Sequence, residues 1–320
     1  MSIRLLTPTL KEGDSISNLE IPCSYQGGKQ RLAKQIVDIF YKENNIDDDT
    51  RFYDLCCGSG AISIELINRG VSPNNIIMID NGCWGSFWQS IANNEFDLDV
   101  FRKELDKLSD IQMIQTYLKD LSNLPVDNDK LVYHYLMLQA GAFGAKQIWI
   151  EGDEWKNNTF RNYWLPTETS NRRSPVNPMM PMPETLYKRV EKIVDVMGGC
   201  ITSSKESVFD TVYRLDEEWD IKKNKNLIIY IDPPYMNTTG YQESFNIYEL
   251  ESAIWNNAPI YISEGFKMEG CKSAILLSKG RTKGNISGEV KKKPVEEWLN
   301  KFEYDDEEII LRREMLRNSL

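Results

Sequence analysis

Apolar side chains in the first quarter of the chain recur with two different spacings. Between residues 31 and 44, Ala33, Ile36 and Phe40 lie three or four positions apart, which predicts an amphipathic helix. Short apolar runs between polar residues are instead typical of buried strands. Such runs predict strands over 51–57 and 74–80, and the segment between them, 61–70, is predicted to be a helix that ends at a glycine. A strand, a glycine-containing turn, a helix and a second strand in this order predict the opening of a doubly wound α/β sheet.

The pattern changes after residue 82, where we expect an insertion. Two helical stretches, 99–121 and 129–143, lead into an irregular, aromatic-rich segment over 147–183. That segment has too few regular apolar repeats to supply strands to a core sheet. We therefore predict a mainly helical and irregular insertion over 83–183, and one α/β domain formed by residues 1–82 and 184–320.

The α/β pattern then resumes and continues towards the end of the chain. The predicted elements are a helix over 183–197, strands over 199–204 and 225–231, a helix over 247–257, strands over 258–266 and 273–279, and a short helix over 294–302. A basic, glycine-containing loop over 279–293 precedes the last helix. This return of alternating strands and helices predicts that both ends of the chain build one sheet.

The composition favours a globular protein without a membrane span. Of the 320 residues 41% are hydrophobic, and no apolar run reaches the roughly 18 residues that a span requires. The first residues lack an apolar leader, so we expect a cytoplasmic protein. The six cysteines form no CxxC pair, and the single histidine, His134, excludes a multi-histidine metal site. We expect no metal, and we expect His134 to pack within a helix.

The first motif with chemical meaning is Asp54-Leu55-Cys56-Cys57-Gly58-Ser59-Gly60, directly after a predicted strand. Glycines there let the backbone turn tightly and approach a ligand, and the following helix N-terminus favours polar oxygens. Asp80 ends the next strand and can accept hydrogen bonds from ribose hydroxyls. Because the NAD fingerprint is incomplete after Gly60, the motif indicates an adenosine-type ligand other than NAD.

The second motif is Tyr25-Gln26-Gly27-Gly28-Lys29, a glycine loop before a helix. Cys23 stands where a P-loop needs its first glycine, and Gln30 stands where it needs Ser or Thr, so a triphosphate site is not favoured. Lys29 could instead meet a carboxylate.

The third motif, Asp232-Pro233-Pro234-Tyr235, follows the apolar run 227–231. Open α/β sheets place their sites at the carboxyl ends of strands. Because the prolines remove two N–H donors, the Asp232 side chain and the Pro233 carbonyl can act as paired acceptors. Two acceptors suit an exocyclic –NH2 group, and Tyr235 can stack on a planar base. The motif therefore predicts chemistry on an exocyclic amine.

Together these motifs resemble the Dam-type (D12 family) site-specific N6-adenine DNA methyltransferases, whose motifs run in this order. The resemblance rests on Tyr25 to Lys29, Asp54 to Gly60, Asp80-Asn81, Asp232 to Tyr235, and the trailing Tyr241 and Phe245. It implies a Rossmann-like sheet that binds S-adenosyl-L-methionine, with a target-recognition region inserted between the glycine motif and Asp232. It further implies methylation of the N6 amino group of a flipped-out adenine in double-stranded DNA, without a metal.

The resemblance also implies roles for individual residues. Asp232, Pro233, Pro234 and Tyr235 would be catalytic. Cofactor binding would fall to Tyr25, Gly28, Lys29, Asp54, Cys57, Gly58, Gly60, Asp80 and Asp232. Candidate substrate contacts are Lys146, Arg161, Tyr163, Arg172, Arg173, Tyr241 and Lys283. The family's recognition signature has only a loose echo in 141–146, so the recognition sequence stays open.

Other functions remain open at this point. Loops like Asp232 to Tyr235 also serve methylation of exocyclic amines in RNA, at guanine N2 or adenine N6. The net charge of −10 is unusual for a nucleic-acid enzyme, since phosphate contacts need Lys and Arg. It is compatible with a non-catalytic DNA mimic or binding module on the same fold. The oligomeric state (monomer or weak dimer) is open too, as is the choice between restriction-modification, phage and regulatory roles.

Overall fold

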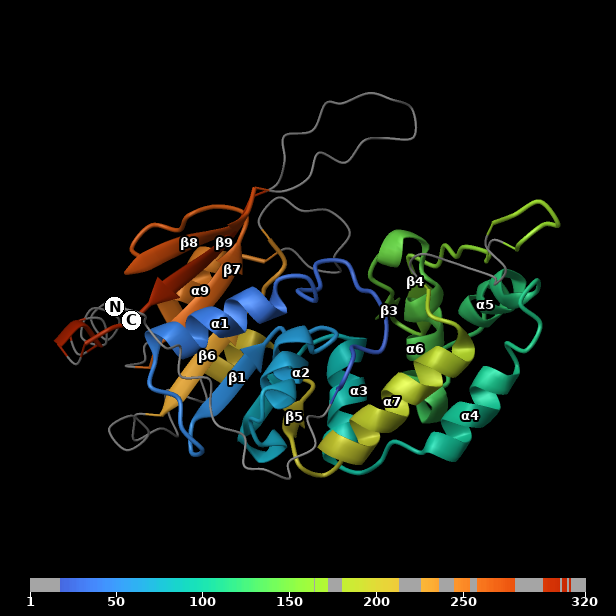
Figure 1. Cartoon of the computed structure of the whole chain (residues 1–320), viewed down its shortest axis with the longest axis horizontal. Coiled ribbons are helices and arrows are strands. Elements are labelled where there is room, and N and C mark those ends of the chain that lie inside the picture. Colours follow the sequence, from blue (N-terminus) through green and yellow to red (C-terminus); the bar gives the residue numbers. More distant parts are fainter. Residues whose placement is uncertain are drawn as a thin grey trace.

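The computed structural model describes residues 18–163, 165–171, 180–212, 226–235, 245–253, 258–279, 296–305, 307–309 and 311. Within them the main sheet has seven strands in the order β5-β2-β1-β6-β7-β9-β8 (Figure 1). β5, β2, β1, β6 and β7 run parallel, while β9 lies antiparallel between β7 and β8. The predicted doubly wound α/β sheet is thus confirmed.

The bounds of the elements follow the chain. The main-sheet strands are β1 (Arg51–Leu55), β2 (Ile76–Ile79), β5 (Thr202–Ser204), β6 (Leu227–Ile231), β7 (Ile260–Glu264), β8 (Ser273–Ser278) and β9 (Glu297–Phe302). The helices are α1 (Ala33–Glu43), α2 (Ala61–Asn68), α3 (Cys83–Ala92), α4 (Leu98–Asp106), α5 (Ile114–Ser122), α6 (Leu131–Gly141), α7 (Pro183–Met197) and α9 (Ile247–Ala253). Three short 3-10 turns are η1 (Pro73–Asn75), η2 (Asn128–Lys130) and η3 (Phe143–Ala145). A small antiparallel hairpin consists of β3 (Trp149–Glu151) and β4 (Glu154–Lys156).

The central strands are buried on both faces because helices cover each side of the sheet. Phe52 and Tyr230 point into the layer formed with α1, α2 and α3. Their neighbours Tyr53 and Ile231 point the other way, into a layer that includes Ile247 of α9. Two-sided burial explains why β2 and β6 read as continuous apolar runs instead of alternating ones.

The register of the parallel strands aligns their carboxyl ends. Leu55 of β1 pairs with Ile79 of β2 on one side and with Ile231 of β6 on the other. The residues that follow these three strands therefore emerge at one edge of the sheet. That edge is where open α/β sheets bind ligands.

The region between β2 and β5 is mainly helical. α3 contacts β2 and β5, while α4, α5, α6 and α7 pack against one another beyond it, at the right of Figure 1. α7 contacts both α3 and α4, so the helices on the two sides of the predicted boundaries form a continuous core. The division into an insertion over 83–183 and a domain formed by the remainder stays a prediction.

Two sequence expectations need correction. The segment 294–302 was expected to form a short helix, but Glu297–Phe302 is the strand β9. Pairing with β7 and β8 on both sides outweighs the weak helical signal of this short run. The long helical stretch 99–121 is interrupted and gives α4 and α5 separately. The other expected helices and strands are present, although α9 is described only as far as Ala253.

His134 lies in α6, where it is buried and its Nε2 is 3.2 Å from Oε2 of the buried Glu104. Packing within a helix, as expected, is confirmed for this residue. All six cysteines are free thiols. In the described part of the chain, no helix has both the length and the apolar character needed to cross a membrane.

Gly85 of α3 generates the first prediction, because the loop after β2 lies against it. A Cβ at this position would stand 2.0 Å from the carbonyl oxygen of Asp80. We expect Gly85→Ala to lower the free energy of unfolding by about 1–3 kcal/mol, the usual cost of overpacking. Chemical denaturation measures the change, with Gln89→Ala on the exposed face of α3 as the control. Equal stability of the two variants would contradict the close approach.

Candidate active site

Asp232 follows β6 directly, at the aligned carboxyl edge of the sheet. Its backbone N–H donates to the carbonyl of Leu55 at 3.1 Å, which continues the β1–β6 ladder by one residue. Pro233 and Pro234 then follow, so the ladder cannot extend beyond Asp232. The side chain of Asp232 is only 15% exposed. The two prolines thus fix where the strand ends, and they leave a nearly buried carboxylate at that end.

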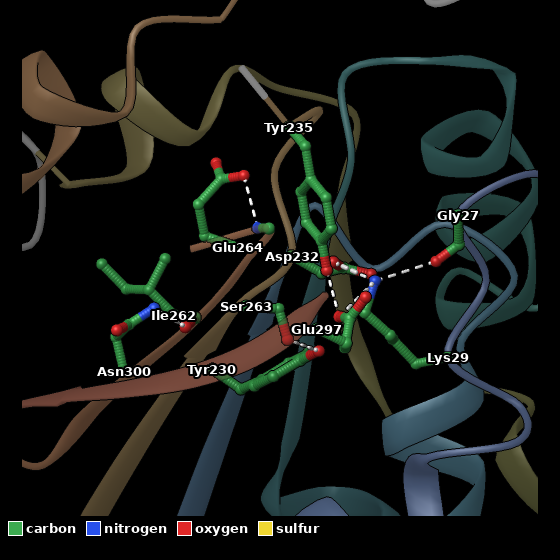
Figure 2. A network of polar contacts seen from close by, with 11 residues as sticks. Gly27, Lys29, Tyr230, Asp232, Tyr235, Ile262, Ser263, Glu264, Glu297 and Asn300 are labelled. Carbon is green, nitrogen blue, oxygen red and sulfur yellow. Dashed lines mark hydrogen bonds and ion pairs between the residues drawn. The ribbon is translucent and has the colours of Figure 1, made fainter. Parts of the chain in front are cut away.

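Three charged or polar side chains, those of Lys29, Glu297 and Tyr235, meet around this carboxylate (Figure 2). The ammonium Nζ of Lys29 lies 2.5 Å from Oδ1 of Asp232 and 3.5 Å from Oε1 of Glu297. It also donates to the carbonyl of Gly27 at 2.9 Å and stands 4.8 Å from the ring centroid of Tyr235. The Tyr235 hydroxyl donates to Glu297. One buried cation is thus shared by two carboxylates beside an aromatic ring.

Burial is the largest influence on both members of the central ion pair. Burial raises the pKa of Asp232 to about 7. The charge of Lys29 lowers this pKa, but the charges of Glu297 and Glu264 oppose that effect. Burial alone would lower the pKa of Lys29. The two carboxylates next to it reverse that effect, and the pKa of the ammonium is raised. Lys29 is therefore charged at neutral pH, while Asp232 titrates near it.

Asp80 ends the neighbouring strand β2 and binds two backbone N–H groups. Its Oδ2 accepts from Gly58 at 2.9 Å and its Oδ1 accepts from Gly82 at 2.8 Å. Burial raises the pKa of Asp80, and these backbone donors oppose the shift. The carboxylate is thus held between the glycine turn after β1 and the start of α3.

The glycine turn itself is packed against aromatic rings. Gly58 has a φ of +50°, and a Cβ there would lie 3.0 Å from the ring of Tyr25. Its carbonyl accepts a hydrogen bond from the indole N–H of Trp88 at 2.8 Å. Tyr25 in turn packs edge-on against Trp84, with ring centroids 5.8 Å apart. Glycine at position 58 is therefore required both by conformation and by space.

The other predicted cofactor residues surround the same turn. The N–H of Gly28 donates to the carbonyl of Tyr25 at 3.1 Å, and the N–H of Cys57 donates to that of Ile79 at 3.0 Å. Gly60 begins α2 with a φ of +75°, and a Cβ there would lie 2.5 Å from the Trp88 ring. The structure thus brings Tyr25, Gly28 and the turn 57–60 together beside Asp80.

Asp54 lies within β1, and its side chain is only 2% exposed. Its Oδ2 accepts from the hydroxyl of Ser63 at 2.6 Å and from the N–H of Ser63 at 3.2 Å. The carboxylate therefore satisfies a donor in the first turn of α2. Burial raises its pKa to about 7, although the Ser63 hydrogen bonds oppose the shift. A role in cofactor binding stays a prediction for this residue.

The predicted substrate contacts are only partly described. Lys146 and Arg161 are exposed, and the Arg161 guanidinium stacks 4.4 Å from the ring centroid of Phe143, which is itself exposed. Tyr163 is instead buried, and its hydroxyl donates to the carbonyl of Pro181 at 2.7 Å. Arg172, Arg173, Tyr241 and Lys283 lie outside the described residues. Their predicted roles stay predictions.

A cavity of about 320 Å³ lies next to the Asp80 loop. Asn81, Gly82 and Cys83 line it from the start of α3, and Lys205 lines it from the end of β5. Residues of the mainly helical region close the other side, namely Val126, Asn128, Leu131, Ile150, Gly152 and Asp153. Among the described residues no cluster of three His, Cys, Asp or Glu side chains could hold a metal ion.

Glu297 is the site residue that sequence reasoning missed. It lies at the start of β9, some 65 positions after Asp232, in a segment expected to be helical. No local pattern marks it, because an acidic residue next to a tryptophan is equally compatible with an exposed helix. Only the antiparallel insertion of β9 brings it to Lys29.

Asp54 generates a prediction on stability. Its pKa of about 7 lies above the ordinary value of 3.8, so the folded state binds this proton more tightly than the unfolded state. The ionised side chain therefore destabilises the folded protein, and increasingly so as the pH rises from about 4 to 7. We expect Asp54→Asn to raise the free energy of unfolding by about 2–4 kcal/mol at about pH 8.

That gain should shrink as the pH falls through 7 and disappear near pH 4, as measured by urea denaturation across the pH range. Asp195→Asn, at an exposed position of α7, is the control and should show no such trend. A variant less stable than wild type at the alkaline end would refute this account of Asp54.

Comparison with known proteins supports the family expected from these motifs. Residues 25–134, about a third of the chain, match the model of the D12 class N6 adenine-specific DNA methyltransferases. No curated protein matches the chain significantly. The matched region contains Tyr25, Lys29, the glycine turn and Asp80, and it supplies β1 and β2 to the sheet, which is that of a Rossmann-like methyltransferase. The D12 class N6 adenine-specific DNA methyltransferase family predicted from the sequence is thus confirmed over residues 25–134 of this chain.

Proposed function

We propose that this protein transfers a methyl group from S-adenosyl-L-methionine to the N6 amino group of adenine in double-stranded DNA. The observation that carries the proposal is the meeting of Asp232 with Lys29 at the carboxyl edge of the sheet, next to the Asp80 turn. The match of residues 25–134 to a family of adenine-specific DNA methyltransferases supports both the reaction and the polymer.

The groups around the glycine turn fit the adenosine part of the methyl donor. Asp80 is anchored by two backbone N–H groups, and each of its oxygens retains acceptor capacity for a ribose hydroxyl. The hydroxyl of Ser59 is buried and has no hydrogen-bond partner among the described residues. It is a polar atom available to a ligand at the N-terminus of α2. The cavity beside Asn81 and Lys205 has room for a nucleoside base.

The charge of the site also fits this donor. Among the residues that the structure describes, Lys29 is the cation that faces the carboxylates of Asp232 and Glu297, so these described groups carry an excess of negative charge above the pKa of Asp232. S-adenosylmethionine supplies an electrophilic methyl group on a cationic sulfonium. A cation is favoured next to nearly buried carboxylates that are not fully neutralised.

The chain's own residues hold the amino group that receives the methyl. The carboxylate of Asp232 accepts one N–H of the adenine amine, and the carbonyl of Pro233 accepts the other. Both contacts increase electron density on the nitrogen. Tyr235 supplies a ring on which the base stacks. Since a neutral carboxyl group accepts more weakly, Lys29 favours the reaction by stabilising the ionised form of Asp232.

Access to N6 requires the base to leave the helix. Extrusion of a base costs a few kcal/mol, which contacts in the pocket and along the backbone must offset. Lys146 and Arg161 are exposed and available to phosphates, and the neighbouring Phe143 offers an exposed ring. The DNA family match favours this substrate over the amines of RNA, and the Lys29–Asp232 pair favours an enzyme over a DNA mimic. A cytoplasmic location stays a prediction.

The first test removes the acceptor. We expect Asp232→Ala to reduce tritiated-methyl transfer to unmethylated DNA by roughly a hundredfold or more, because the amine loses its charged acceptor. Thermal unfolding should show that the variant still folds. Asp195→Ala, an exposed acid on α7, serves as the matched control and should retain full activity. Normal transfer by the Asp232 variant would remove this residue from the reaction.

The second test addresses the methyl donor. We expect Asp80→Ala, which removes the predicted acceptor for the ribose hydroxyls, and Lys29→Ala, which removes the cation predicted to meet the donor's carboxylate, each to weaken S-adenosylmethionine binding by about 10- to 100-fold in isothermal titration calorimetry. Lys34→Ala, at an exposed position of α1, is the control for Lys29. Unchanged affinity in either variant would exclude that residue from the donor site.

A further inference from the structure

β9 brings a residue of the C-terminal part of the chain into the site. The strand runs antiparallel between β7 and β8, so it begins at the edge where the parallel strands end. Trp298 pairs with Glu264, the last residue of β7, and Glu297 stands one position before it. The topology therefore places Glu297 beside the residues that follow β6.

The side chain of Glu297 connects two groups that the proposed reaction uses. It accepts a hydrogen bond from the hydroxyl of Tyr235, and its Oε1 lies 3.5 Å from the ammonium of Lys29 (Figure 2). It is only 16% exposed. A carboxylate held in this environment must be compensated by its partners, since an unpaired one would carry a large desolvation cost.

We propose that Glu297 is a positioning residue of the methyl-transfer site, which fixes the ring of Tyr235 and orients the ammonium of Lys29 towards Asp232. The proposal rests on the proposed function, because it assigns Glu297 to that same reaction. Glu297 itself contacts neither the base nor the methyl group in this role. It acts through Tyr235, on which the base stacks, and through Lys29, which holds Asp232 as an ionised acceptor.

The hydrogen bond to Tyr235 sets the plane of the stacking ring. Two prolines restrict the backbone that leads into Tyr235, but the ring can still rotate about the side-chain bonds. Anchoring the hydroxyl removes that freedom before the base arrives. Preorganised positioning of this kind lowers the entropic cost of reaching the reactive geometry.

The ionisation of Asp232 depends on all the charged groups that face it. Lys29 from the glycine loop lowers its pKa, whereas Glu297 from β9 and Glu264 from β7 raise it. The charge of Asp232 in turn raises the pKa of Asp54 of β1. Tyr230 of β6 shares its hydroxyl with Ser263 and stays neutral, because burial raises its pKa well above the ordinary value. Loss of the Glu297 charge should therefore lower the pKa of Asp232.

The test combines a pH profile with two matched pairs of variants. The wild-type rate, measured as kcat/KM for methyl transfer to plasmid DNA, should fall on the acid side with a midpoint near 7, as Asp232 takes up a proton. Glu297→Gln should move that midpoint down by about one pH unit, since a neighbouring charge is removed. Glu297→Ala should in addition reduce kcat by about tenfold, because Tyr235 and Lys29 lose their anchor.

The controls separate positioning from other effects. Glu296→Gln and Glu296→Ala change the same residue type one position away, on an exposed side chain bonded to Trp298. They should leave both the midpoint and kcat unchanged. Tyr235→Phe removes the same hydrogen bond from its other end without a change of charge. It should lower kcat and leave the acid midpoint at its wild-type value.

Each outcome decides the question. A lowered midpoint in Glu297→Gln, together with a reduced kcat in Glu297→Ala and Tyr235→Phe, supports the proposal. An unchanged midpoint overturns it, whether activity is normal or uniformly reduced at every pH, because a merely structural role would produce the second pattern. Glu297→Gln preserves the shape of the side chain, and thermal unfolding checks its fold. Absence of methyl transfer by the wild-type protein would instead refute the proposed function, so the two failures are distinguishable.

Discussion

The ion pair between Lys29 and Asp232 is the interaction on which the site depends. It joins the glycine loop before α1 to the end of β6, two segments separated by some 200 positions in the chain. The pair is nearly buried, so removal of either partner would leave an uncompensated charge. Glu297, Tyr235 and Gly27 are all arranged around the same ammonium. The loop, the parallel strands and the antiparallel strand β9 thus meet at one cation.

The site concentrates negative charge where the fold would be more stable without it. Asp54 and Asp232 both have a pKa of about 7, because burial disfavours their ionised forms. Such destabilisation at a functional site is common, since activity and stability make different demands on the same residues. In the proposed reaction the cost has a purpose. Incompletely neutralised carboxylates would attract a cationic methyl donor, and an ionised Asp232 would accept a hydrogen bond from the adenine amine.

Much of the sheet and part of the site follow from local sequence patterns. β2 and β6 are continuous apolar runs, β1 is a partly apolar one, and open α/β sheets place their sites at the carboxyl ends of such strands. The structure brings Lys29 to Asp232 and Asp80 to Gly58, which motif order alone could not specify. Glu297 could not be predicted, because its place depends on the pairing of β9 with β7 and β8. Long-range pairing of a six-residue run leaves no periodic signal that distinguishes it from a short helix.

The most direct test of the central claim identifies the product. Purified protein is incubated with S-adenosylmethionine that carries an isotopically labelled methyl group and with unmethylated double-stranded DNA, and the DNA is then digested to nucleosides. Mass spectrometry should find the label in N6-methyladenine, and the label should be lost with the Asp232→Ala variant. Label in another nucleoside, or none in DNA under conditions where the protein is folded and binds the donor, would contradict the account.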